Sequence, residues 1–469
     1  MTVAHPLRRA TSRRALVVAA CALVAGCATT EAPSAPVAAG PVAAPDRATT
    51  KGAGTSRPPT RAERLAIDQL AREAERVRGL RFRRPVEVEV HDGARIAADL
   101  AKQIEQKELD KARAVYGALG LLDPALDLRA MLEHLLAEQV VGYYDPERKE
   151  LVVRDDVIRT LRADRIGHVD AASDEARLVL IHELIHALQD QDLGLGERYR
   201  AARDTDAENA FRSVIEGDAT LGMLAAALQR QGVPLDRVAG QLEGMLGQID
   251  LTGPLAGEAL RKAPAIVRVG LVAPYIDGAQ LMARIYAQLG WAGVNDAVRH
   301  PPPTMTQVMH PEKLWRGQLP DRITLPRFRG IEQAGYVSVD EDTLGELELG
   351  VYFGQGLRGG VDARAAEGWS GDRVRVYARR RAPEDHPTAA VWFSAWERSA
   401  DAARALRAAR RVAGLRGADD QAYAARRGRA LLIIRGLPHA LMPEVRADFV
   451  RFARGLPKRP GRHAHPLLD

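Results

Sequence analysis

Residues 178–190 have the sequence LVLIHELIHALQD, which contains the pattern His-Glu-x-x-His at His182, Glu183 and His186. Residues four apart lie on one face of an α-helix, so the two imidazoles can bind the same metal ion. Glu183 lies beside them and can accept a proton from water without being a ligand itself. The segment is therefore predicted to belong to a zinc-binding helix. This helix is expected to span residues 173–192.

Apolar residues support a helix that is held against a core. They fall on the face opposite the histidines and comprise Ile181, Leu184, Ile185 and Leu188. A half-buried helix of this kind would hold the imidazoles rigid. Ser173 is expected to cap the N-terminus, with Asp174 and Glu175 in the first turn, where the helix dipole favours negative charge.

Two histidines alone could equally be part of a polar helix face, so a third ligand decides the matter. Residues 213–220 have the sequence SVIEGDAT inside a predicted helix, and Glu216 follows His186 by 30 residues. Two histidines, one glutamate and an open fourth position form a common catalytic zinc site. The competing third ligands lie at the start of the same helix and are Asp204, Asp206 and Glu208. Asp218 is expected either to orient a ligand imidazole or to be a solvated helix charge.

The two cysteines, Cys21 and Cys27, both lie in the first thirty residues, so a metal site in the body must use histidine and carboxylate. Residues 1–27 are predicted to be an export signal, because four arginines precede a short apolar run that ends in LVAGC. That ending resembles a bacterial lipobox, which implies a lipid on Cys27 and a membrane anchor. Ala28 next to it favours the outer membrane if the host is Gram-negative. An ordinary secretory signal is the alternative.

Composition restricts the class of protein. The chain has 469 residues, of which 46% are hydrophobic and 27% charged, which is typical of a globular protein with a sizeable core. The net charge is +6, but removal of the four leader arginines leaves about +2. No nucleic-acid partner is therefore expected.

The chain is predicted to contain two folded units of class α+β. Residues 28–60 are a Pro/Ala-rich flexible linker, residues 61–325 a catalytic domain, residues 326–457 a smaller α+β domain, and residues 458–469 a basic tail. A hairpin is expected at residues 139–154, around the turn that contains Pro146. Helices are expected at 61–78, 94–117, 127–138, 206–231, 277–289, 401–412 and 443–452, and strands at 83–91, 373–378, 389–393 and 430–434.

These blocks resemble gluzincin metallopeptidases of the peptidase-MA superfamily, in particular poorly characterised bacterial lipoproteins and surface proteins. The resemblance rests on HELIHALQDQ and EGDAT, and extends to VVGYYDPERKELVV, to PYIDG at residues 274–278 and to PPTMTQVMHPEK at residues 302–313. It implies a zincin-like domain, in which a small twisted sheet lies over the HExxH helix above a mainly helical lobe. Residues 149–154 are then expected to border the cleft and pair with an extended peptide.

A zinc peptidase also needs a donor for the oxyanion of the tetrahedral intermediate. Among the accompanying blocks, His310 and Tyr275 are the expected donors, and the alternative for His310 is a packing role in its loop. The predicted activity is hydrolysis of peptide bonds with Zn²⁺ and with Glu183 as general base. Two alternatives stay open: an envelope binding or scaffold lipoprotein without catalysis, and a zinc amidase that acts on the cell wall.

Overall fold

The computed structural model describes residues 54–161, 171–194, 204–248, 257–379, 388–412 and 421–457. The predicted export signal with Cys27, most of the predicted linker and the basic tail 458–469 lie outside these residues. The end of the linker prediction is wrong, because Ser56 and Arg57 form a strand that pairs with Val90 and His91.

The first sheet has four strands in the order β1-β2-β4-β3. Its strands are β1 (Ser56–Arg57), β2 (Glu87–His91), β3 (Gly142–Asp145) and β4 (Glu150–Arg154). The predicted hairpin is confirmed, since β3 and β4 pair antiparallel, whereas β2 and β4 are parallel. The expectation that residues 149–154 border the cleft is wrong. β4 has a neighbour on both sides, whereas β3 and β1 are the edge strands.

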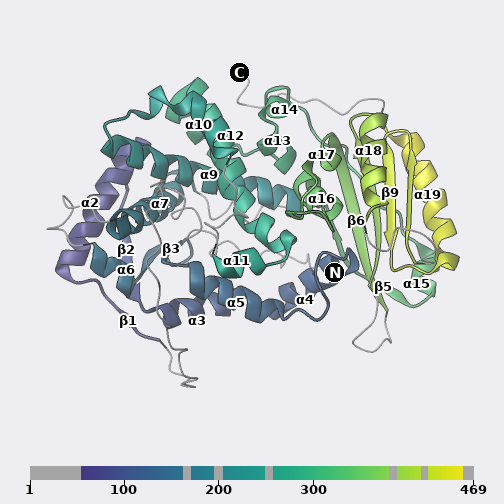
Figure 1. The fold of residues 1–469 in the computed structure, drawn as a ribbon, viewed down its shortest axis with the longest axis horizontal. Coiled ribbons are helices and arrows are strands. Elements are labelled where there is room, and N and C mark those ends of the chain that lie inside the picture. The colour runs from purple at the N-terminus through teal and green to yellow at the C-terminus, as the bar shows by residue number, and fades with distance from the viewer. Residues whose placement is uncertain are drawn as a thin grey trace, which may run out of the picture.

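Helices make up most of the part that surrounds this sheet (Figure 1). They are α2 (Arg61–Arg78), α3 (Gly93–Gln103), α4 (Gln106–Ala118), α5 (Leu128–Gln139), α6 (Asp155–Thr160), α7 (Ala171–Leu193), α9 (Thr205–Arg230), η2 (Leu235–Arg237), α10 (Ala239–Leu246), α11 (Glu258–Lys262), α12 (Ala265–Arg299), α13 (Met305–Met309) and α14 (Pro311–Trp315). The single helix expected at 94–117 is instead two. Ile104 takes an extended conformation and is buried, so the chain turns inward between α3 and α4.

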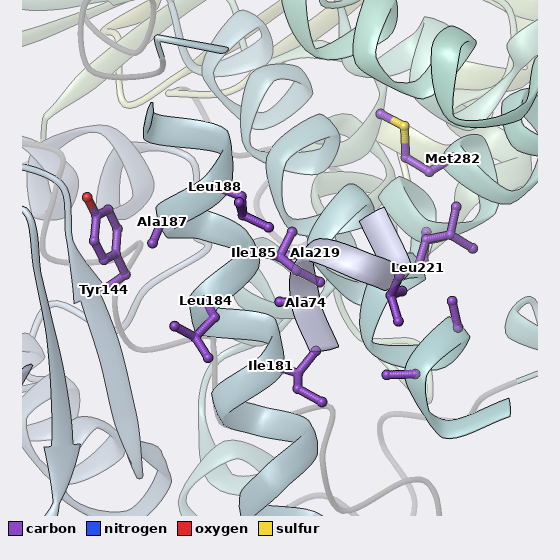
Figure 2. Packing of buried hydrophobic residues seen from close by; sticks show 14 of the residues in the cluster. Ala74, Tyr144, Ile181, Leu184, Ile185, Ala187, Leu188, Ala219, Leu221 and Met282 are labelled. Atoms are coloured by element: carbon purple, nitrogen blue, oxygen red, sulfur yellow. The ribbon is translucent and has the colours of Figure 1, made fainter. Parts of the chain in front are cut away.

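Helix α7 contains the HExxH pattern and is buried on all sides from Val179 to Asp190. The prediction of a half-buried helix is therefore wrong, and Ser173 lies inside the helix and is not its cap. Figure 2 shows the reason: Tyr144 of β3 lies on one side of the helix, while Ala74 of α2 and Ala219 of α9 lie on the other. A helix that is enclosed by a sheet and two other helices has no solvent-facing stripe in its central turns.

The second sheet has five antiparallel strands in the order β5-β6-β7-β9-β8. Its strands are β5 (Tyr336–Asp342), β6 (Trp369–Arg379), β7 (Ala389–Trp396), β8 (Tyr423–Arg427) and β9 (Ala430–Arg435). The accompanying helices are α15 (Arg329–Gln333), α16 (Gly345–Phe353), α17 (Ala363–Ala366), α18 (Ser399–Ala409), η3 (His439–Leu441) and α19 (Met442–Gly455). One face of the sheet packs with α16, α17 and α18, and the other with α15 and α19. The molecule is thus of mixed α+β class with two sheets.

The predicted boundary at 325/326 falls in the segment between α14 and α15. One hydrophobic cluster nevertheless extends across it, because Leu132 of α5, Tyr275 of α12 and Trp392 of β7 belong to the same buried group. None of the described helices is both long and apolar enough to cross a membrane.

Candidate metal centre

Helices α7 and α9 bring three predicted ligands together. Nε2 of His182 lies 3.2 Å from Oε2 of Glu216, and Nε2 of His186 lies 3.3 Å from the same oxygen. The two Nε2 atoms are 3.1 Å apart. All three residues are buried, with His186 retaining the largest exposed fraction, 8%. Three atoms of types that can bind a metal therefore face one common point from α7 and α9.

Glu183 is buried beside this point and is held by the edge strand. The backbone N–H of Tyr144 in β3 donates to Oε2 of Glu183 at 2.9 Å. Its other oxygen, Oε1, is buried and has no hydrogen-bond partner among the described residues. Burial raises the pKa of the Glu183 carboxyl, against the opposing effect of the two histidines. One oxygen is thus fixed, and the other is left to accept a proton.

Each member of this cluster affects the ionisation of the others. Burial by itself would raise the pKa of Glu216, but the adjacent imidazoles outweigh it and hold that pKa below its ordinary value. Burial likewise opposes the charged form of His186, yet the Glu216 carboxylate raises the pKa of His186 to about 9. The cluster therefore favours an ionised carboxylate, the form that binds metal ions.

His182, Glu183 and His186 form a cluster that could hold a metal ion. Their possible ligand atoms lie within 4.8 Å of one another. The contacts within 3.3 Å nevertheless join both imidazoles to Glu216. Glu183 is held by Tyr144 on the side of the sheet, so Glu216 is the carboxylate in direct contact with both imidazoles.

The position of Glu216 depends on a close crossing of α9 and α12. A Cβ atom added to Gly217 would lie 2.2 Å from the carbonyl carbon of Gly278, and one added to Gly278 would lie 1.9 Å from the carbonyl oxygen of Ser213. Only glycine fits at both positions. The EGD and DG sequences are thus explained by the approach of two backbones next to the ligand.

A buried chain of polar contacts supports His186 from behind. Nδ1 of His186 lies 2.8 Å from Oε1 of Gln189, and the Gln189 amide donates to Oδ2 of Asp218 at 2.8 Å. Arg78 of α2 pairs with Asp218 at 2.7 Å and donates to Oδ1 of Asn295 at 2.7 Å. One expectation for Asp218 was that it orients a ligand imidazole directly. Its contact with His186 is instead indirect, through Gln189.

Neither Gln189 nor Arg78 was predicted to belong to the site. A signal for Gln189 is present in the sequence, because it follows His186 by three residues and so shares its helix face. Since Gln189 presents its oxygen, Nδ1 of His186 is the donor, and Nε2 is the ring nitrogen that faces the ligand point. For Arg78 no sequence signal exists, because it lies in a separate helix.

The two expected oxyanion donors take different places. The ring of Tyr275 is fully buried and stacks on that of His182, with centroids 5.8 Å apart. His310 follows α13, and its Nε2 lies 2.8 Å from Oε1 of Glu346 in α16. Burial opposes the charge on His310, but the bond to Glu346 raises its pKa overall. Its charge also reaches Asp277, whose pKa burial raises to about 7 and His310 lowers. Sequence reasoning did not identify Glu346.

The competing third ligands have other contacts. Asp204 caps α9 by accepting from the backbone N–H of Ala207 at 3.0 Å, and Asp206 accepts from the N–H of Met305 at 3.1 Å. Glu208 lies two turns before Glu216 and lines a separate cavity. Of the four carboxylates considered, only that of Glu216 has a contact with the histidines in the described part of the chain.

Comparisons with known proteins add little to the site itself. Residues 332–446 match a family described as a domain of unknown function (DUF8575), and this span includes all five strands of the second sheet. No curated protein matches the chain. Among solved structures, it is similar to a candidate hydrolase with a novel fold from Chloroflexus aurantiacus, with 17% identity and a TM-score of 0.33, over 55% of this chain and 90% of that one.

Proposed function

We propose that this chain is a zinc-dependent hydrolase of peptide bonds, of the gluzincin type. The observation that carries the proposal is the convergence of His182, His186 and Glu216 on one point, with Nε2 and Oε2 atoms 3.1–3.3 Å apart. Two imidazoles and one carboxylate suit zinc, and a catalytic site keeps its fourth position open for water or substrate. The free Oε1 of Glu183 next to this point is the second supporting feature.

His182, His186 and Glu216 would hold the ion. When bound, zinc polarises the substrate carbonyl and lowers the pKa of water at the site. Glu183 then accepts the proton of the attacking water on its free oxygen and returns it to the leaving amine. The N–H of Tyr144 keeps the carboxylate in position during both transfers, since it binds the other oxygen at 2.9 Å.

His310 is the proposed donor to the oxyanion, in preference to Tyr275. The bond to Glu346 favours the protonated imidazole, which is the form that donates to a negative oxygen. Tyr275 is fully buried against His182, so we assign it to packing of the ligand ring. His310 interacts electrostatically with Asp277, which lies two residues after Tyr275 on α12.

The edge strand β3 is the proposed binding element for an extended peptide. Among the described strands, β3 pairs with β4 alone, so its other edge has no strand neighbour. The N–H of Tyr144 points from that other edge toward Glu183. A peptide that adds to this edge would pass the general base. This role replaces the one expected for residues 149–154, because β4 (Glu150–Arg154) has neighbouring strands on both sides.

The test combines metal content with turnover. Chain purified with zinc should bind about one ion and cleave peptides, whereas Glu183→Gln should keep the ion and lose activity by several orders of magnitude. His186→Ala should lose both. Protein without zinc after metal-replete purification would rule the proposal out. Parallel assays with peptidoglycan separate a peptidase from a cell-wall amidase.

We also propose that the protein acts at the cell envelope, anchored by lipid on Cys27. The support is the LVAGC sequence and the Pro/Ala-rich stretch that follows it. In cells fed labelled palmitate, the parent chain should take up label and sediment with membranes. Cys27→Ser should do neither.

A further inference from the structure

Arg212 is a buried arginine near the candidate metal centre, and two of its guanidinium nitrogens have no hydrogen-bond partner among the described residues. Arg212 lies on α9, one turn before Glu216, and is 6% exposed. Its Nε and Nη2 atoms are buried without a hydrogen bond, and its guanidinium makes no ion pair with any described residue. An unpaired buried charge is costly, so proteins rarely keep one without a use for it.

Arg212 lines a cavity of about 160 Å³ between α4, α5, α9, α12, β5 and α16. Its walls are mainly apolar and include Val115, Leu132 and Ile266, while Asn209 lies beside Arg212 on the same helix face. A cavity of roughly 150 Å³ accommodates a group the size of benzene. The space therefore fits one apolar side chain together with a small anionic group at the arginine.

Several other charged groups line the cavity, among them Glu105, Glu108, Glu208 and Asp342. Lys111 pairs with Asp340 at 2.9 Å, and Glu348 accepts from the hydroxyl of Tyr116 at 2.9 Å. Glu105 is exposed to solvent. Among the described residues that line the cavity, Arg212 is thus the cation whose charge no contact offsets.

We propose that Arg212 binds the free C-terminal carboxylate of a peptide that ends in an apolar residue. A guanidinium offers paired donors that match a carboxylate, and the apolar walls receive the last side chain. The inference rests on the proposed peptidase function and narrows its substrates to peptides held by their C-terminus.

The placement on α9 relates this site to the scissile bond, although the residues of the metal centre do not line the cavity. Arg212 and Glu216 are four residues apart on one helix, which corresponds to about 6 Å along its axis. The arginine side chain extends further toward the N-terminus of α9. An extended peptide advances about 3.3 Å per residue, so a carboxylate at Arg212 leaves roughly two or three residues beyond the scissile bond.

The experiment compares acetyl-Leu-Leu with acetyl-Leu-Leu-amide by calorimetry on the zinc-loaded full chain carrying Glu183→Gln, which prevents turnover. The acid should bind at least about tenfold more tightly than the amide. Arg212→Met should remove this preference, whereas Lys111→Met, which removes a paired cation of the same cavity, should keep it. The preference should also persist after zinc is removed with a chelator, because Arg212 is not a ligand.

Several results would overturn the assignment. They are equal affinity for acid and amide in the parent chain, a preference that survives Arg212→Met, and a fall in Tm of more than about 5 °C in Arg212→Met without peptide. The last would mean that the charge has a structural partner. Arg212-dependent binding without cleavage would refute the hydrolase and leave the site standing. Cleavage without carboxylate preference would do the reverse.

Discussion

Gly217 and Gly278 face each other where α9 crosses α12, so closely that a Cβ on Gly217 would lie 2.2 Å from the carbonyl carbon of Gly278. Glu216 precedes one of these glycines, and Tyr275, which stacks on His182, lies three residues before the other. The spacing of the two helices therefore sets the position of both a ligand carboxylate and the ring that packs on a ligand imidazole.

Widening this crossing should damage the metal centre. In Gly278→Ala the new methyl group would meet the Ser213 carbonyl oxygen at 1.9 Å, so the helices must separate. We expect a loss of about 1–3 kcal/mol in the free energy of unfolding and weaker zinc binding. Gly270→Ala is the matched control on α12, since nothing lies within 4 Å of its Cβ position. Urea unfolding measures the stability and zinc titration the affinity. Equal stability and equal zinc affinity in the two variants would show that the close crossing does not support the site.

Gln189 should control the affinity for zinc through His186. Gln189→Leu removes the acceptor from Nδ1 of His186, so the imidazole is no longer held in one tautomer. Loss of such an outer contact typically lowers metal affinity by about 10- to 100-fold. Gln191→Leu, two residues further along the same helix and bonded to Arg84 at the surface, should change the affinity little. Competition with a chromophoric chelator gives both values, and an unchanged affinity in Gln189→Leu would contradict this role.

Removing one partner of the Arg78–Asp218 pair should destabilise the fold more than removing both charges. Both side chains are fully buried, so Arg78→Met leaves the Asp218 charge without its cation. The expected loss is about 3–5 kcal/mol in the free energy of unfolding, and Arg78→Met combined with Asp218→Asn should recover part of it. Arg83→Met breaks a surface pair with Asp192 and should cost less than about 1 kcal/mol. A double variant as unstable as Arg78→Met alone would argue against charge as the cause.

The His310–Glu346 pair should show itself in the pH dependence of activity. Glu346 raises the pKa of His310 against the effect of burial, so the protonated donor persists above its ordinary range near pH 6.5. The contribution of this pair to the free energy of unfolding is fully present below that range. It is lost as the pH rises through the pKa of His310 in the folded state. In Glu346→Gln the alkaline limb of the kcat profile should therefore move to lower pH. An unchanged limb would exclude His310 as the donor.

Local patterns predicted much of this fold. The helix at residues 61–78 has its expected bounds, because Thr60 and Glu63 form a capping box and Gly79 ends it in a left-handed conformation. The hairpin was predicted from its turn residues, and Asp145 indeed accepts from the backbone of the turn. The break at Ile104 was missed, since burial of that residue against other helices, not local propensity, ends α3.

The sequence by itself determined that His182, Glu183 and His186 share one helix, because helical periodicity acts over a few residues. It also indicated Glu216 as the carboxylate most suited to join them. Only the tertiary structure decided that α7 is enclosed on all sides, that the edge strand β3 holds Glu183, and that two distant contacts form. Arg78 reaches Asp218 behind His186, and Glu346 pairs with His310. Such contacts depend on how whole elements pack, and no short-range pattern encodes them.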